Sequence, residues 1–195
     1  MGFPTDHDLL VQRCLGCTVC RLRLHRRNAV VFRGVYPSPL MLVGEAPGAE
    51  EDEKGLPFVG PSGQLLDRLL HRAGVPSDAF YLCNTVKCRP PNNREPTPEE
   101  VAQCRPLLLD QVALVHPRRI VTLGKTATMA LTATRGSMGA LLDRLDLVCF
   151  WAETIPVIPV YHPAYLLRRL DDPSARVEVR DTVARLQRAW QGAPG

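Results

Sequence analysis

Short apolar runs recur along the chain, and segments with a helical spacing of apolar residues separate them. Runs of this length and composition are typical of strands that are buried on both faces of a parallel sheet. They predict four strands, at residues 40–43, 80–85, 119–123 and 157–161. The apolar segment Ala29–Phe32 is a further candidate strand.

The segments between these strands carry helix signals. The clearest is Thr97, a good N-cap that is followed by Pro98 at the first helical position and by Glu100 as the partner in a capping box. Gly74 and Pro76 end another helical pattern. The predicted helices are residues 5–16, 64–73, 97–115 and 126–132, a helix that opens after His162, and residues 174–190. Residues 134–150 allow no assignment.

This alternation predicts an α/β fold, with three α/β/α layers around a central, mainly parallel four-stranded sheet. Residues 1–195 are expected to form a single domain, because the length suits one core and no repeat or linker interrupts it. The carboxyl ends of parallel strands meet at one edge of such a sheet. Glu45, Asn84 and His162 follow three of the predicted strands, so we expect them to converge on one crevice there.

The stretch from Leu40 to Gly63 concentrates unusual features around the first of these strand ends. The strand breaks into the turn GEAPG (residues 44–48), whose residues cannot continue a strand. A patch of acids follows, and then Phe58 between two short apolar neighbours. A carboxylate and an aromatic ring at the carboxyl end of a strand predict a binding site.

The composition is that of an ordinary globular protein, with 45% hydrophobic and 23% charged residues. No apolar run is long enough to span a membrane and no signal peptide is evident, so a cytoplasmic location is expected. The net charge of +4 favours an acidic partner only weakly. Most basic residues are arginines, which suit bidentate contacts with phosphate but equally reflect coding by a GC-rich genome.

Seven cysteines are many for a cytoplasmic chain, where disulfides are rare. Metal or cluster ligation is the leading alternative. Cys14, Cys17 and Cys20 form two overlapping C-x-x-C pairs. Their spacing alone does not decide between zinc and an iron–sulfur cluster, because four thiolates bind either.

Four segments together form a specific pattern: GEAPGAEED (44–52), GLPFVGPSGQLLD (55–67), NTVKCRPPNNREPTPEE (84–100) and HPAYLLR (162–168). In these segments and in their order, the chain resembles the iron–sulfur-containing family 4 of the uracil-DNA glycosylases. The resemblance extends over about residues 17–170. It implies a DNA repair enzyme that flips uracil out of DNA and hydrolyses its N-glycosidic bond, leaving an abasic site.

The resemblance implies how the base is bound. Phe58 would stack on the flipped-out uracil. The Asn84 amide would read the edge of the base, donating to O4 and accepting from N3–H, and cytosine would reverse both groups. Glu51 would crowd C5 and exclude the methyl group of thymine.

The resemblance also implies the residues at the reacting bond. His162 would lie near O2 and stabilise the negative charge that develops on the leaving uracil. Glu45 and the main chain of Ala46 would lie near the sugar and the attacking water. Glu45 would either orient that water or stabilise the cationic sugar.

The cysteine pattern of this family, C-x-x-C-x-L followed by an arginine, fits Cys17, Cys20 and Arg26. With Cys88 and Cys104, these cysteines would be the four ligands of a 4Fe–4S cluster that ties the N-terminal segment to the basic loop near residue 88. Zinc is the less favoured alternative, because the second pair lacks the C-x-x-C spacing of a zinc ribbon. The remaining cysteines are expected to be structural: Cys14, Cys83 and Cys149.

The partner implied by the resemblance is uracil-containing DNA, single- or double-stranded. The chain is expected to act as a monomer, without membrane association, in the cytoplasm and nucleoid of a bacterial or archaeal cell.

Structural interpretations stay open for several of these residues. Taken alone, Glu45 suits a helix cap, Asn84 a turn and Phe58 the core. In the segment LLRR (166–169), the leucines suit either the core or a wedge that fills the gap left by the flipped base. The two arginines suit either solvent or the phosphates of DNA.

Two other functions compete with the enzyme. The first is a uracil-DNA-binding protein with little turnover, because a related branch of the superfamily traps uracil DNA covalently. That branch carries Gln where this chain has Ala46, and a basic insertion with a histidine before the last strand; residues 124–156 contain no histidine. The second is a nucleotide-binding protein, but the GKT at 124–126 lacks the glycine that a phosphate-binding loop needs at position 119, which is Arg119.

Overall fold

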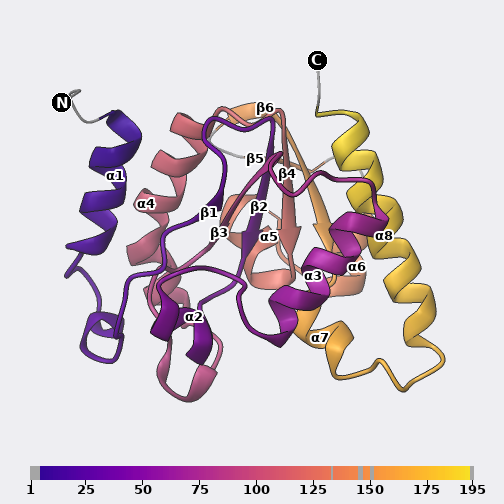
Figure 1. The fold of residues 1–195 in the computed structure, drawn as a ribbon, viewed down its shortest axis with the longest axis horizontal. Helices are drawn as coiled ribbons and strands as arrows, with labels where there is room; N and C mark the ends of the chain where they lie inside the picture. The colour runs from indigo at the N-terminus through magenta and orange to yellow at the C-terminus, as the bar shows by residue number, and fades with distance from the viewer. Residues whose placement is uncertain (1–4, 133, 145–146, 150–151, 194–195) are drawn as a thin grey trace.

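A six-stranded sheet in the order β1-β3-β2-β4-β6-β5 forms the middle layer of the computed structural model, which describes residues 5–132, 134–144, 147–149 and 152–193 (Figure 1). The strands are β1 (Arg33–Gly34), β2 (Leu40–Gly44), β3 (Phe80–Asn84), β4 (Arg119–Leu123), β5 (Val148–Cys149) and β6 (Ala152–Val160). The strands β3, β2, β4 and β6 are parallel neighbours, as predicted. The two short edge strands, β1 and β5, pair antiparallel with β3 and β6.

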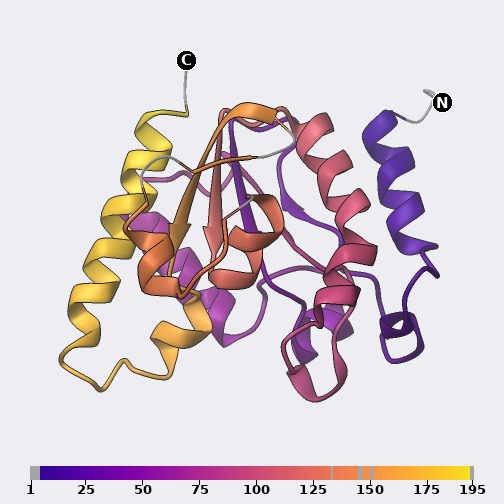
Figure 2. The ribbon, with the colours of Figure 1, turned by 180° about the vertical axis from the view of Figure 1, so that it is seen from behind.

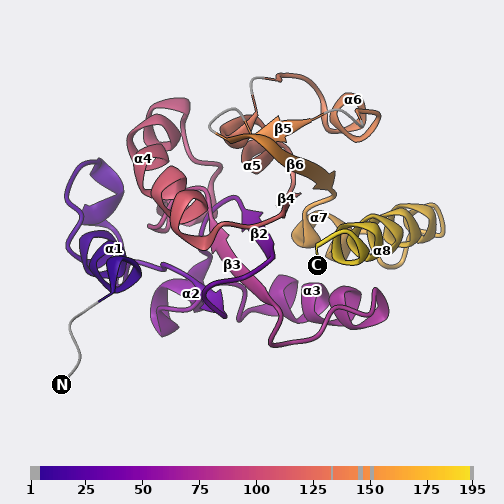
Figure 3. The same cartoon turned by 90° about the horizontal axis from the view of Figure 1, so that it is seen from above.

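Two layers of helices cover the sheet. The α-helices are α1 (Asp6–Leu15), α2 (Ala49–Lys54), α3 (Pro61–Arg72), α4 (Pro98–Val115), α5 (Lys125–Leu131), α6 (Met138–Leu142), α7 (Pro163–Leu167) and α8 (Ala175–Gln191). Two short 3-10 helices occur at Arg21–Leu24 and Pro91–Asn93. Seen from above, α3 and α8 lie on one side of the sheet and α4 and α5 on the other, with α1 outside α4 (Figure 3). Figure 2 views the molecule from behind, the side on which α5 and α6 lie.

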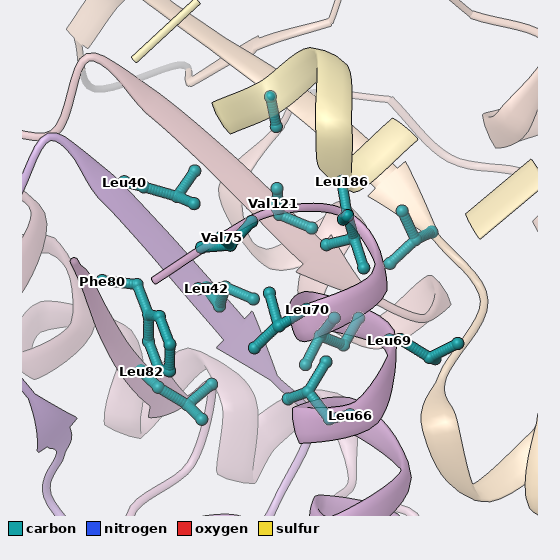
Figure 4. Close-up of a cluster of buried hydrophobic side chains, with 14 of the residues drawn as sticks. Leu40, Leu42, Leu66, Leu69, Leu70, Val75, Phe80, Leu82, Val121 and Leu186 are labelled. Atoms are coloured by element: carbon teal, nitrogen blue, oxygen red, sulfur yellow. The ribbon is translucent and has the colours of Figure 1, made fainter. Parts of the chain in front are cut away.

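The alternating side chains of the central strand explain why it is apolar throughout. Leu40 and Leu42 of β2 pack with α3 and α8, in the cluster shown in Figure 4. Met41 and Val43 point to the other face and pack with α4 and α5. Both faces of β2 are therefore buried, which is the arrangement that a short, uninterrupted apolar run predicts.

The helix ends follow the predicted caps closely. Thr97 accepts a hydrogen bond from the Glu100 N–H at 3.2 Å, and the Glu100 carboxylate accepts one from the Thr97 N–H at 2.8 Å. Thr5 caps α1 in the same way, with Asp8 as its partner. All five helices with predicted bounds begin and end within three residues of them, and the largest difference is α3, which begins at Pro61 rather than residue 64.

The prediction of a strand at Ala29–Phe32 is wrong. These residues adopt no regular structure, and the edge strand begins one residue later, at Arg33. The segment is apolar because Ala29, Val30 and Val31 are buried, not because it pairs along a strand. Besides the two 3-10 helices, four elements were not predicted: β1, α2, α6 and β5. Each is too short to show a periodic pattern.

The strand order places a crevice beside β2. The chain passes from β2 to β3 on one side and then returns to β4 on the other. Loops that leave β2 and β4 at their carboxyl ends diverge at such a reversal, and ligands of open α/β sheets bind there. In the part of the chain that the structure describes, no helix is both long and apolar enough to cross a membrane.

Candidate active site

A cleft of about 860 Å³ opens at the carboxyl edge of the sheet. It lies among the loops that follow β2, β3, β4 and β6, at the edge where Figure 1 shows α2 and α7. All six residues predicted to bind or act on the substrate line this cleft: Glu45, Ala46, Glu51, Phe58, Asn84 and His162. Sequence segments more than 100 residues apart therefore meet here, as the strand-end pattern predicts.

Asn84 ends β3 and is completely buried, with 0% of its surface exposed. Neither its side-chain oxygen nor its side-chain nitrogen has a hydrogen-bond partner within the described residues. Each unpaired buried polar group costs about 1–3 kcal/mol. The amide therefore has a donor and an acceptor free at the cleft, where a ligand could complete both hydrogen bonds.

Phe58 packs over the end of β2, where Gly44 leaves room for it. A side chain on Gly44 would stand 2.4 Å from Asn84 Oδ1 and 2.5 Å from Phe58 Cζ. Gly44 thus brings the aromatic ring and the amide together at the base of the cleft. Phe58 adopts a left-handed backbone conformation with φ of 55°. Strain of this kind costs about 1–3 kcal/mol and concentrates at functional sites.

Glu51 holds the loop that carries Phe58. Its Oε1 accepts hydrogen bonds from the main-chain N–H groups of Val59 at 2.9 Å and Gly60 at 2.8 Å, and its Oε2 accepts one from Gly48 at 3.1 Å. The carboxylate therefore fixes the ring of Phe58 through its own loop. The sequence did not predict this positioning role, and the exclusion of a methyl group by Glu51 stays a prediction.

His162 stands between β6 and α7, half-buried, with its ring centroid 6.0 Å from that of Phe58. Its Nδ1 accepts a hydrogen bond from the Ala164 N–H at 3.1 Å. A main-chain N–H can only donate, so Nδ1 carries no proton and the neutral ring is protonated on Nε2. Burial, together with the positive charge of Arg168, lowers the pKa of His162 to about 4. The ring is therefore a neutral N–H donor near pH 7.

Glu45 follows β2 and is held by Thr126 at the start of α5. The Thr126 hydroxyl donates to Glu45 Oε2 at 2.7 Å. Burial raises the pKa of Glu45, while the Thr126 hydrogen bond lowers it. Thr126 was not predicted as a site residue, although it follows the fourth parallel strand end, β4, at the same edge as the other three.

The rim of the cleft carries charged side chains of both signs. Lys125 and Arg168 are exposed and line it, and so do Arg94 and Glu95. Arg94 also forms a two-pronged ion pair with Glu100, at 2.7 and 2.8 Å, which fixes the loop before α4. Lys125 and Arg168 are therefore the cations best placed to meet an anionic ligand.

The segment after His162 divides into structural and exposed residues. Leu166 is fully buried and Leu167 packs against the same cluster, so both leucines belong to the core. Arg169 pairs with Asp172 at 2.7 Å and with Glu178 at 2.6 Å, which ties α7 to α8. Of the two arginines, Arg168 alone keeps a position on the cleft.

The four predicted ligand cysteines gather in one cluster beneath α1 and α4. Cys88 and Cys104 are buried, and Cys17 and Cys20 pack against them half-buried. Burial raises the pKa of Cys88 and raises that of Cys104 to about 11, with smaller contributions from the neighbouring thiols. Arg26 Nη1 donates to Cys88 Sγ at 3.0 Å. The same cluster also contains Cys14, so the assignment of the four ligands stays a prediction.

Four thiols from three chain segments, with an arginine donating to one sulfur, suit a cluster of thiolates in number and type. Within the described residues no three Cys, His, Asp or Glu side chains already stand at metal-ligand positions. The structure therefore agrees with the predicted cluster site in the type of its four donors and in their proximity, but not in metal-ligand geometry. The spare cysteines are buried among apolar side chains: Cys14, Cys83 and Cys149.

Comparisons with known proteins match the chain to one family. The family model for the uracil DNA glycosylase superfamily matches residues 33–191. A type-4 uracil-DNA glycosylase of Thermotoga maritima is 41% identical over 182 residues, which cover 89% of this chain and 90% of that protein. A type-4 uracil-DNA glycosylase of Pyrobaculum aerophilum is 41% identical over 188 residues, with coverages of 94% and 92%. A third, from Archaeoglobus fulgidus, is 37% identical over 166 residues, with a coverage of 83% of each chain.

Proposed function

Because this chain belongs to the uracil DNA glycosylase superfamily, and within it to the type-4 family, we propose that it excises uracil from DNA. The reaction is hydrolysis of the N-glycosidic bond, with free uracil and an abasic site as products. The observation that carries the proposal is the buried Asn84 amide, whose donor and acceptor are both unpaired in the described part of the chain and border the cleft.

The Asn84 amide complements one edge of uracil. Its NH₂ group donates to O4 and its oxygen accepts from N3–H. Cytosine presents a donor and an acceptor in the reverse positions, so both contacts with the buried amide would be mismatched. When a wrong ligand leaves the buried polar groups of a site unpaired, the site discriminates strongly against that ligand.

Phe58 supplies the surface on which the base stacks. A uracil within a duplex is not accessible to this buried edge, so the nucleotide leaves the stack before it is read. The Glu51 carboxylate holds the Phe58 loop through the main-chain amides of Val59 and Gly60, so the ring is in place before the base arrives. Such preorganisation spares the binding energy that ordering the loop would otherwise consume.

His162 stabilises the leaving uracil. When the glycosidic bond breaks, negative charge develops on the base, including O2. The neutral imidazole presents Nε2–H as a donor, because Nδ1 is occupied by the Ala164 N–H. A donor that is already oriented toward developing charge contributes about 10²–10³-fold in rate.

Glu45 acts on the other side of the breaking bond. The sugar becomes cationic in the transition state, and a carboxylate there stabilises it and can orient the attacking water. Thr126 holds one carboxylate oxygen and favours the charged form, which either role requires. The Ala46 main chain lies beside this position on the same cleft.

Cys17, Cys20, Cys88 and Cys104 would hold the 4Fe–4S cluster, which supplies a structural link rather than chemistry at the base. The link joins the segment after α1 to the loop between Asn84 and α4. Absorbance near 400 nm with stoichiometric iron would identify the cluster. A colourless protein with bound zinc would contradict it.

The function is tested with an oligonucleotide that carries one uracil, in single- and double-stranded form, followed by treatment with alkali. Strand breaks at the uracil are expected, and a matched thymine oligonucleotide should stay intact. No release of uracil would refute the proposal. Release of uracil that leaves a heat-stable protein–DNA adduct in place of an alkali-labile abasic site would instead support the trapping alternative, and a gel shift without any release of uracil would support the binding alternative.

A further inference from the structure

A groove outside the cleft lies between α3 and the start of α8, two helices that Figure 3 shows side by side. Its volume is about 320 Å³. Three exposed arginines line it, Arg72 at the end of α3 and Arg176 and Arg180 on successive turns of α8. Leu170 and Val179 are apolar parts of the lining, and no Asp or Glu of the described ranges belongs to it. The groove is therefore a concave and purely cationic surface.

The arginines of the groove have no counter-charge in the part of the chain that the structure describes. Neither a hydrogen bond nor an ion pair engages the side chains of Arg72, Arg176 and Arg180 there. The acids of α3 and α8 are paired with other arginines: Asp67 with Arg33 at 2.7 Å, Glu178 with Arg169 at 2.6 Å and Asp181 with Arg185 at 2.7 Å. Three like charges around one groove repel each other, so the arrangement favours a bound anion.

The groove and the cleft lie along the same helix. Ser62, in the first turn of α3, lines the cleft, and Arg72, the last residue of α3, lines the groove. Ten residues of helix span about 15 Å. The loop between α7 and α8 also joins the two sites, since Arg168 lines the cleft and Leu170 lines the groove. A ligand that extends beyond the cleft along α3 therefore reaches the three arginines.

The proposed substrate is a ligand of this kind. Successive phosphates of one DNA strand advance about 3.4 Å along the helix axis, so a distance of about 15 Å corresponds to about four or five nucleotides. Guanidinium groups bind phosphate through two parallel hydrogen bonds. The apolar lining at Leu170 and Val179 suits the deoxyribose between two phosphates. The charge, the shape and the position of the groove thus match a sugar–phosphate backbone.

We propose that the groove formed by Arg72, Arg176 and Arg180 binds the DNA backbone about four or five nucleotides away from the uracil in the cleft. The inference rests on the proposed function and deepens it, because it assigns the substrate a second contact outside the cleft. Phosphate contacts of this kind supply affinity and fix the register of the strand, and they carry no sequence information. The groove therefore helps the protein hold DNA of any sequence while the cleft tests the base.

The first experiment compares two single-stranded oligonucleotides with one uracil each, flanked on both sides by about two or by about ten nucleotides, so that only the longer one reaches the groove. The variant combines Arg72→Gln, Arg176→Gln and Arg180→Gln, because glutamine preserves helix propensity. On the longer oligonucleotide, KM should rise at least about tenfold with kcat unchanged, and the slope of log KM against log salt should fall by about two, since each contact with a single strand contributes about 0.7. On the shorter oligonucleotide the variant should equal the wild type.

Arg188→Gln is the matched control for the single variant Arg180→Gln. Arg188 is also exposed on α8 but does not line the groove, so both variants lose one charge from the same helix. Arg180→Gln alone should lower the salt slope by about 0.7, and Arg188→Gln should leave it unchanged. An unaltered KM and salt slope of the triple variant on the longer oligonucleotide would overturn the proposal. So would an equal loss on the shorter one, or an equal effect of Arg188→Gln.

The second experiment locates the contact on the strand. A neutral methylphosphonate replaces one phosphate at a time in the longer oligonucleotide, and fluorescence anisotropy measures the affinity. Wild-type binding should weaken when the replaced phosphate is about four or five nucleotides from the uracil on one side. The triple variant should be insensitive at that position, because its contact is already lost. Wild-type sensitivity in the triple variant would contradict the groove as the phosphate site.

The outcomes separate the groove from the proposed function. A wild type that does not excise uracil from the shorter oligonucleotide would refute the proposed function, because this substrate does not need the groove; the anisotropy measurements still test the groove in that case. Excision that no arginine substitution alters would refute only the groove. Binding of polyglutamate that is lost in the triple variant, with DNA affinity unchanged, would assign the groove to an acidic protein and overturn the proposal.

Discussion

Replacing Thr126 with valine tests whether the charged form of Glu45 drives the reaction. The substitution keeps the shape of the side chain and removes the hydroxyl that donates to Glu45 Oε2 at 2.7 Å. Burial raises the pKa of Glu45, and Thr126 is the main influence that opposes it. Without the hydroxyl, the carboxylate should therefore bind a proton at a higher pH than in the wild type.

The size of the effect follows from the strength of this hydrogen bond. A hydrogen bond to a charged group contributes about 1.5–3 kcal/mol, and Glu45 is only partly buried, so the lower end applies. About 1.4 kcal/mol corresponds to one pH unit. The acidic limb of the rate profile should thus move upward by about one pH unit, because the active anion is lost earlier as the pH falls. Activity well above that limb should change by less than tenfold.

The assay is the single-turnover rate of uracil excision from pH 4 to pH 9, measured for the wild type and for two variants. Thr126→Ser retains the hydroxyl and should keep the wild-type profile, which makes it the matched control. Thermal unfolding of both variants verifies that the fold is intact. An acidic limb that stays in place in a folded Thr126→Val would refute the reasoning that Glu45 acts as an anion held by Thr126.

Three further substitutions test the remaining site residues. Asn84→Asp replaces the donor to O4 with an acceptor and should lower uracil excision at least 10²-fold in single-turnover assays; an unchanged preference for uracil would remove its role as the base reader. His162→Ala should slow excision about 10²–10³-fold. Because the pKa of His162 is lowered to about 4, the ring is neutral above that pH, and a rate that depended on its titration near pH 6.5 would contradict the assignment. Glu51→Gln should raise KM more than it lowers kcat, and should reduce the free energy of unfolding by about 1–2 kcal/mol in chemical denaturation, because the loop of Phe58 loses a charged acceptor; an unaltered KM would argue against loop positioning.

The main architecture was predictable because it depends on local patterns that repeat. Apolar runs that are buried on both faces identify the four parallel strands, and capping residues such as Thr97 identify where helices begin. Strand ends at one edge then bring Glu45, Asn84 and His162 together without any further information. The elements that escaped prediction were the short ones, α2 and α6 and the two edge strands, whose residues are too few to establish a period.

The supporting contacts of the site could not be predicted, because they join residues through loops of irregular shape. Glu51 accepts hydrogen bonds from the main chain of Val59 and Gly60, directly after Phe58, whose left-handed backbone no sequence pattern indicates. The buried Lys87 donates from Nζ to the main-chain oxygen of Asn84, a contact that no sequence pattern indicates. For Thr126 a signal did exist, since the strand-end rule applies to β4 as well as to its neighbours.

Glu45 and Glu51 line a cleft whose proposed partner, DNA, carries many negative charges. The two acids are compatible with this partner because each has a different environment. Glu51 uses both oxygens to accept hydrogen bonds from main-chain amides, so its carboxylate is occupied by the protein itself. Glu45 has one oxygen on Thr126, and its other oxygen has no hydrogen-bond partner within the described ranges. Lys125 and Arg168 stand exposed at the rim, where phosphates would arrive first. In the reaction proposed above, the sugar becomes cationic only as the glycosidic bond breaks, so Glu45 would interact more strongly with the transition state than with the bound substrate. Interactions that grow along the reaction in this way raise kcat, whereas equally strong binding of substrate and transition state does not.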